Sequence, residues 1–222
     1  MKEIRLLEEN LQQCAQCHLR KDCVGVTSWN GTPKSPLMII GEGPGQVEDQ
    51  YGVPLVGPSG KLLDKALKAV GIARHLVFTT NIIKCRPLRN RTPITEEALF
   101  CASNWLEKEI MLLKPKVILA LGSVSLRYLC NNPKASIIKM RGNWFTSSYG
   151  IEVMPTFHPA YILRQTGEAL KKTKWQVFYD FQAVRARCAE LSPEYSFTDG
   201  TWPEMSDIYI ERKLKRLGQI KG

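Results

Sequence analysis

The chain lacks any long apolar segment. None of its 222 residues belongs to a run approaching the ~20 apolar residues that a membrane-spanning helix needs. The amino terminus, MKEIRLLEENLQQC, is charged throughout and has no apolar centre of the kind found in signal peptides. Internal repeats and low-complexity tracts are also missing. We therefore expect a cytoplasmic protein with one main globular domain and no contact with a membrane.

Acidic residues are few relative to basic ones. The sequence has 31 lysines and arginines against 21 aspartates and glutamates, which gives a formal net charge of +10 and a pI near 9.3. This balance is typical of a surface that meets polyanions. It favours nucleic acid only weakly, because many basic proteins bind none.

The seven cysteines are an odd number in a chain without an export signal, which argues against a disulfide framework. Cys14 and Cys17 form a C-x-x-C pair, and Cys85 and Cys101 flank a proline-rich segment. Four such thiolates can hold zinc or an iron-sulfur cluster, and the alternative is a redox dithiol with two buried thiols. Three cysteines lie outside this set: Cys23, close to the first pair, and Cys130 and Cys188, in predicted helices.

Four short apolar runs predict buried strands, at 37–40, 76–83, 117–121 and 151–157. The segments between them have helical periodicity. Such alternation predicts a three-layer α/β/α fold with a central four-stranded parallel sheet. The expected helices are 3–13, 61–70 capped by Ser59, a long one to 113 capped by Thr95, 126–129 capped by Ser123, and 166–191.

The composition changes after residue 191. Residues 1–191 are expected to form the domain, and 192–222, rich in turn formers and then in charge, an appendage with a possible basic amphipathic helix. We assign the appendage no role from the sequence.

Chemically active side chains follow the predicted strands, and ligands of parallel α/β sheets bind at those carboxyl ends. The first strand runs into GEGPG (41–45), which fails the dinucleotide pattern at Gln46. Glu42 points either into the crevice or into solvent. His158 is either a donor to a developing anion or a hydrogen-bonded core histidine. Asn81 offers an amide to a nucleobase edge or caps a strand end.

Four segments, GEGPGQVED, GVPLVGPSGKLLD, TTNIIKCRPLRNRTP and TFHPAYILR, together resemble the motif set of the family-four, iron-sulfur uracil-DNA glycosylases. The resemblance covers about 14–164 and not the carboxyl-terminal tail. It implies a uracil-DNA glycosylase-like fold and a [4Fe-4S] cluster, in preference to zinc. The implied cluster ligands are Cys14, Cys17, Cys85 and Cys101.

The same resemblance implies roles for the pocket residues. Asn81 pairs with the uracil edge, His158 stabilises negative charge on uracil O2, and Glu42 positions or activates the attacking water. Gly41, Gly43 and Glu48 lie against the substrate. Uracil must leave the base stack to reach them, so the loop with Leu163 and Arg164 is expected to contact DNA. The expected partner is uracil-containing DNA, single- or double-stranded. The resemblance does not fix the oligomeric state, and a monomer is the default expectation for an enzyme that scans DNA.

The sequence departs from the family pattern at Leu55, where relatives usually place a phenylalanine that stacks on uracil. Two other readings follow from this departure. One is a glycosylase for another deaminated base, such as hypoxanthine or xanthine. The other is a non-catalytic iron-sulfur module that binds DNA without releasing a base.

Overall fold

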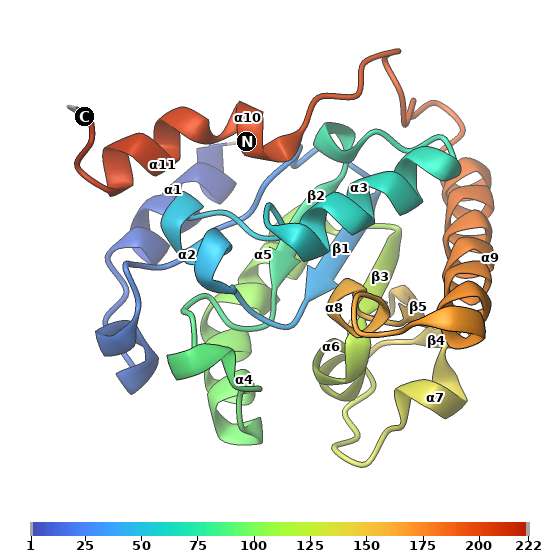
Figure 1. Ribbon diagram of the computed structural model, residues 1–222, viewed down its shortest axis with the longest axis horizontal. Coiled ribbons are helices and arrows are strands. Elements are labelled where there is room, and N and C mark those ends of the chain that lie inside the picture. The colour runs from blue at the N-terminus through green and yellow to red at the C-terminus, as the bar shows by residue number, and fades with distance from the viewer. Residues whose placement is uncertain (1, 221–222) are drawn as a thin grey trace.

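The computed structural model describes residues 2–220 and shows a central sheet between two layers of helices (Figure 1). The sheet has five strands in the order β2-β1-β3-β5-β4. These are β1 (Leu37–Gly41), β2 (Phe78–Asn81), β3 (Val117–Leu121), β4 (Phe145–Thr146) and β5 (Glu152–Thr156). All neighbours pair in parallel except β4, which runs antiparallel to β5. The predicted α/β fold is therefore confirmed, but the count of four strands is wrong. The two residues of β4 are too few to show a strand pattern.

The helices connect and cover these strands. They are α1 (Lys2–Gln12), α2 (Gln46–Tyr51), α3 (Pro58–Ala69), α4 (Thr95–Cys101), α5 (Glu107–Leu113), α6 (Gly122–Leu129), α7 (Ile137–Met140), α8 (Pro159–Ile162), α9 (Gly167–Leu191), α10 (Met205–Ile208) and α11 (Ile210–Arg216). No helix within residues 2–220 combines the length and the apolar character that a membrane span requires.

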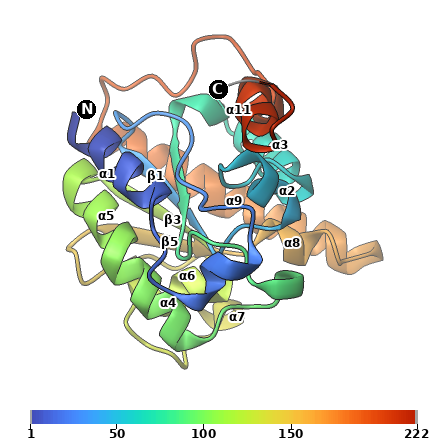
Figure 2. The ribbon, with the colours of Figure 1, turned by 90° about the vertical axis from the view of Figure 1, so that its left-hand side faces the viewer.

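The strands are buried on both faces because alternate residues enter two separate apolar cores. Met38 and Ile40 pack into the core formed with α1, α5 and α6, whereas Leu37 and Ile39 pack into the core formed with α3 and α9. The view in Figure 2 places α1 and α5 on one side of the sheet and α9 on the other. Such continuous apolar strands are typical of parallel sheets covered on both faces.

Helix boundaries differ from the predicted ones in two respects. The expected long helix ending at 113 is divided into α4 and α5 by a π-helical turn, Ala102–Leu106. Such π-helical turns are rare, so the sequence predicts one unbroken helix here. The predicted caps Ser59, Thr95 and Ser123 are also wrong, since the helices begin one or more residues earlier, with Gly57, Ile94 and Leu121 as the capping residues.

The segment after α9 returns across the molecule to α1 and α2 (Figure 1). Met205 is buried against Tyr51, Val53 and Val56. In the basic helix α11, Arg216 donates to the Val26 carbonyl at 2.9 Å. The tail thus packs on the loop that follows the C-x-x-C pair and on α2.

Candidate active site

The carboxyl ends of the parallel strands open into a cavity of about 390 Å³. Six residues expected from the sequence line it: Glu42, Gly43, Glu48, Leu55, His158 and Arg164. Gly41 and Asn81 lie beside it at the ends of β1 and β2, paired in register. Leu163 is not in the lining and is half exposed, next to Arg164. The topology therefore gathers chemically active side chains from distant segments at one edge of the sheet.

Asn81 is buried at the end of β2, beside the cavity. The residue is 1% exposed, and its Nδ2 has no hydrogen-bond partner among residues 2–220. A Cβ on Gly41 would meet Asn81 Oδ1, and a Cβ on Gly43 would meet the Ile83 side chain. Glycine at both positions is therefore required for this packing. A buried donor without a partner costs free energy, so a ligand that supplies an acceptor would be favoured here.

His158 precedes α8 and caps it. Its Nδ1 accepts a hydrogen bond from the Ala160 backbone N–H at 3.1 Å, so in the neutral ring the proton is on Nε2. Burial, with a smaller contribution from Arg164, lowers the pKa of His158 to about 4. The imidazole is thus a neutral donor at physiological pH. Gly122, at φ +87°, admits this ring, because a Cβ there would lie 2.9 Å from His158 Cβ.

Glu42 faces the same space from the end of β1. Burial raises the pKa of its carboxyl above the ordinary value, and the nearby cations Arg164 and Arg127 oppose that rise. Glu42, His158 and Arg164 also line an adjoining cavity that continues toward α6. A carboxyl with a raised pKa beside a neutral imidazole is an arrangement suited to acid–base chemistry.

Glu48, at the start of α2, is buried, and its carboxylate accepts hydrogen bonds from the backbone. Its carboxylate accepts from the N–H groups of Gly45 at 3.1 Å, Val56 at 3.1 Å and Gly57 at 2.8 Å. It joins the glycine-rich turn after β1 to the loop that carries Leu55. The side chain lines the cavity, and because its carboxylate is bound to three backbone N–H groups, its role is to hold the cavity wall in shape.

Leu55 adopts a left-handed backbone conformation, with φ of 53°, and its side chain is buried against the cavity. This conformation costs roughly 1–2 kcal/mol for a residue with a Cβ. Close packing holds it in place, because a Cβ on Gly60 would meet the Leu55 carbonyl. The resemblance to the family-four enzymes implies a phenylalanine at this position, where this chain has leucine.

For the uracil release that the resemblance implies, we predict that Leu55→Phe raises kcat/KM about tenfold. Stacking of a base on an aromatic ring contributes ~1–3 kcal/mol. The left-handed backbone costs phenylalanine about the same conformational free energy as leucine, because both carry a Cβ. Single-turnover assays on a uracil oligonucleotide measure the change. Leu55→Met, of similar volume but without a ring, is the matched control and should show no gain. An unchanged rate for Leu55→Phe would mean that another side chain stacks on the base.

The four cysteines expected to bind the cluster converge on one side of the sheet. Cys14 and Cys17 pack against the apolar core that contains Cys85 and Cys101. Burial raises the pKa of Cys101 to about 12, and charge on Cys17 and Cys14 adds to this rise. Within residues 2–220 no three His, Cys, Asp or Glu side chains are placed to hold a single metal ion.

Cys23 is closer to this group than the sequence suggested. A hydrogen bond with Cys85 lowers the pKa of Cys23 to about 7, and Arg20 Nη1 lies 3.9 Å from its Sγ. Cys188 packs in the core on the opposite face of the sheet, and Cys130 follows α6. Only Cys23 among the remaining cysteines therefore adjoins the proposed ligands.

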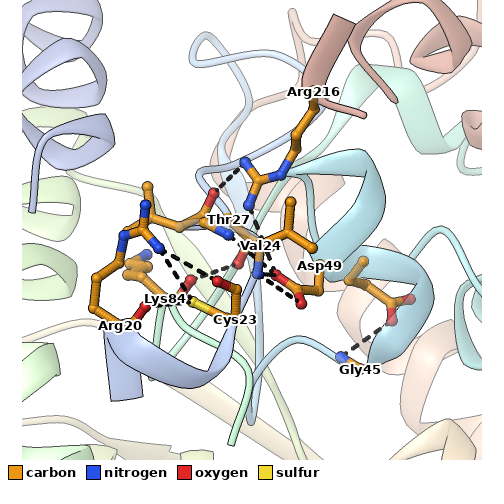
Figure 3. A network of polar contacts seen from close by, with 11 residues as sticks. Arg20, Cys23, Val24, Thr27, Gly45, Asp49, Lys84 and Arg216 are labelled. Atoms are coloured by element: carbon orange, nitrogen blue, oxygen red, sulfur yellow. Dashed lines mark hydrogen bonds and ion pairs between the residues drawn. The ribbon is translucent and has the colours of Figure 1, made fainter. Parts of the chain in front are cut away.

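Polar contacts join α2 to the segment after Cys23 and to α11 (Figure 3). Asp49 in α2 accepts from the Val24 N–H at 3.0 Å and forms an ion pair with Arg216 at 3.7 Å. The buried Lys84 donates to Glu109 at 2.8 Å, and its backbone N–H donates to Cys101 Sγ at 3.3 Å. These contacts were not foreseen, because their partners are far apart in sequence and carry no shared motif.

The segment between Cys85 and Cys101 supplies a further wall that was not predicted. Pro87, Asn90, Arg91 and Pro93 line the cavity. Arg91 is paired with Glu97, and it is the first cause of a pKa of about 2 for that carboxyl. The only signal in the sequence was the density of proline and arginine in this segment.

Comparison with known proteins bears on this arrangement. The family model described as "Uracil DNA glycosylase superfamily" matches residues 29–182. The chain is 38% identical over 169 residues to a type-4 uracil-DNA glycosylase of Thermotoga maritima, covering 76% of this chain and 88% of that protein. It is 39% identical over 167 residues to one of Saccharolobus solfataricus, covering 72% and 77%.

A type-5 uracil-DNA glycosylase of Pyrobaculum aerophilum is more distant, at 28% identity over 107 residues, 48% of this chain and 46% of that protein. The type-4 proteins are therefore the better match in both identity and coverage. The chain belongs to the uracil-DNA glycosylase superfamily and, within it, to the type-4 uracil-DNA glycosylases.

Proposed function

We propose that the chain flips uracil out of DNA and hydrolyses the bond between the base and deoxyribose, leaving an abasic site. Membership of the type-4 family supports this function. The observation that carries the residue assignment is the buried Asn81 amide, whose Nδ2 lacks a partner within residues 2–220. A base inside a duplex cannot reach such a group, so the nucleotide must leave the stack.

Asn81 recognises uracil in this proposal. Uracil presents O4 as an acceptor and N3–H as a donor, and one amide matches both through Nδ2 and Oδ1. Cytosine presents an amino group and a bare N3 at the same edge, so the same orientation of the amide rejects it. The buried position strengthens this discrimination, because a mismatched edge leaves desolvated groups unpaired.

His158 stabilises the leaving base. As the glycosidic bond lengthens, negative charge develops on uracil O2, and the Nε2–H of a neutral imidazole can donate to it. The Ala160 N–H fixes the tautomer that makes this donation possible. A donor placed where charge develops favours the transition state over the ground state.

Glu42 positions the water that attacks C1′ and takes its proton. The reaction passes through an oxocarbenium-like sugar, which a nearby carboxylate also stabilises. Glu48 acts indirectly, through the loop that it holds at Val56 and Gly57. Leu163, half exposed beside Arg164, is placed to enter the minor groove, while Arg164 meets phosphate.

We predict an acid limb in the pH profile of kcat/KM with a midpoint above 4.5, the ordinary value for a glutamate. The ionised Glu42 is the active form, and burial raises its pKa, so activity falls as the pH drops through that raised value. Glu42→Gln should remove the limb and lower the rate roughly 10²–10⁴-fold. The surface variant Glu96→Gln should retain both. A limb that persists in Glu42→Gln would assign it to another group.

The four cysteines hold a [4Fe-4S] cluster in this proposal, and the cluster joins the segment after α1 to the segment after β2. The convergence of Cys14, Cys17, Cys85 and Cys101 on one core supports the assignment. The bound group supplies structural cross-linking, since hydrolysis requires no electron transfer. We further infer a monomer acting in the cytoplasm, from sequence considerations alone.

Release of free base from labelled oligonucleotides tests the function. Each oligonucleotide carries one uracil, hypoxanthine, xanthine or thymine. We expect uracil release by the cluster-loaded protein, lowered roughly 10- to 100-fold by Asn81→Ala, as loss of a buried hydrogen-bond partner requires. Asn143→Ala, on the exposed turn after α7, is the control. Release of a different base would move the specificity, and DNA binding without release would favour a non-catalytic module.

A further inference from the structure

A second cavity, of about 530 Å³, lies beyond the proposed active site. It is bounded by α4 and α6 and by the loops at 131–133 and 148–149. Its volume is within the range of small-molecule sites, ≈ 300–1,000 Å³. Within residues 2–220 its lining includes Pro93, which also lines the proposed active site, but none of Glu42, Asn81 and His158.

This cavity adjoins the active site, because neighbouring cavities have lining residues in common. Thr92, Val124 and Arg127 line it and also line the adjoining cavity of about 390 Å³. That adjoining cavity in turn shares Glu42, His158 and Arg164 with the proposed uracil pocket. Pro93 lines both the far cavity and the proposed uracil pocket, so the three hollows adjoin one another between the pocket and the space beside α4 and α6.

The walls of the far cavity combine flat apolar surface with fixed polar groups. Leu99 and Ala98 come from α4, and the rings of Tyr128 and Tyr149 come from α6 and the 148–149 loop. The two tyrosine hydroxyls are 2.9 Å apart, and the Tyr128 hydroxyl donates to Glu107 Oε1 at 2.9 Å. Aromatic and aliphatic surface with hydrogen-bonding groups at its margin is the chemistry that receives a nucleobase.

The junction between the hollows carries a cation. Arg127 is exposed, yet its Nε donates to the Ala135 carbonyl at 3.3 Å, which anchors the guanidinium. Arg164 lines the adjoining cavity as well. A strand that passes from one hollow to the next places a phosphate between two nucleosides at this junction, and arginine is well suited to bind it.

We propose that the cavity between α4 and α6 binds the base of the nucleotide adjacent to uracil on the same strand, with the linking phosphate at Arg127. The inference rests on the proposed function and extends it to a second nucleotide. It implies a preference for substrates whose neighbouring base is free to leave its stack. Single-stranded DNA and mismatched neighbours are then better substrates than a fully paired duplex.

Filling the cavity tests this inference. Leu99→Trp places a large ring at its rim, and Leu112→Trp, on the exposed side of α5, is the matched control. Each protein is assayed on single-stranded uracil oligonucleotides with normal neighbours, and on oligonucleotides with an abasic analogue immediately 5′ or 3′ of the uracil. We expect Leu99→Trp to lower kcat/KM about tenfold on the normal substrate, because the ring blocks the neighbouring base. The variant should match wild type on the oligonucleotide in which that neighbouring base is missing.

The experiment distinguishes a failure of the second base site from a failure of the proposed uracil-releasing function. A change confined to substrates that have the neighbouring base supports the second site and identifies the side on which it lies. Equal activity of Leu99→Trp and wild type on every substrate, or an equal loss on all of them, overturns it. Uracil release by the wild-type protein in the same assay stands as the separate test of the proposed function. Melting temperatures of the variants detect a folding defect.

Discussion

Replacing His158 with alanine is expected to lower kcat for uracil release roughly 10²–10³-fold, with a much smaller change in KM. Removal of one preorganised donor to a developing oxyanion has an effect of this size. His158 donates to charge that is present in the transition state and small in the bound substrate, so its loss raises the barrier more than it weakens binding. Rapid-quench single-turnover kinetics on a uracil oligonucleotide separate the two effects.

The pH dependence tests whether the imidazole acts in its neutral form. The pKa of His158 is about 4, so the imidazole stays neutral, with its proton on Nε2, throughout the range from about 5 to 9. We therefore expect no limb from His158 near its ordinary value of 6.5. His75→Ala, at a site where the ring contacts Asp199 on the surface, is the control and should retain full activity. Equal losses in kcat and in substrate affinity for His158→Ala would contradict the assignment.

The sequence predicted the sheet and the position of the cavity because both depend on local patterns. Apolar runs of strand length mark β1, β2, β3 and β5, and parallel topology then requires their carboxyl ends to meet. Glu42 follows β1 directly, Asn81 is the last residue of β2, and His158 lies two residues after the end of β5. Their approach to one another is therefore a consequence of topology, which short sequence windows can reveal.

Contacts between distant segments were not predictable in the same way. Lys84 is 1% exposed and paired with Glu109, although an isolated lysine in a sequence is normally a surface residue. The Asp49–Arg216 pair depends on how the tail folds back, which no periodicity encodes. Cys23 lies beside Cys85 for a similar reason: its neighbour is set by the loop path and not by spacing.

The left-handed conformation of Leu55 was hidden too, because positive φ is ordinarily signalled by glycine or asparagine. The structure shows what imposes it. Glu48 fixes the two following N–H groups, and Gly60 leaves room for the Leu55 carbonyl. A buried carboxylate and a small residue in the next helix thus determine a backbone conformation that propensity alone disfavours.

Loss of one proposed cluster ligand is expected to have the largest effect on stability. Cys101→Ala should yield protein without the brown colour of an iron-sulfur cluster and with a melting temperature lowered by well over 10 °C. The site joins segments from opposite ends of the amino-terminal half, and metal binding to such sites contributes directly to folding free energy, ≈ 10–16 kcal/mol for structural zinc. Absorbance near 400 nm, iron analysis and thermal unfolding measure the outcome.

Three control variants make the cluster prediction specific. Cys130→Ala and Cys188→Ala remove thiols that lie away from the group and should keep both colour and iron content. Cys23→Ser is the stricter control, because Cys23 lies beside the proposed ligand Cys85 but is not itself proposed to bind the cluster. If Cys23→Ser loses iron while Cys14→Ala keeps it, the fourth ligand is Cys23, and the segment from 18 to 23 would then have to carry the cross-link now assigned to the C-x-x-C pair.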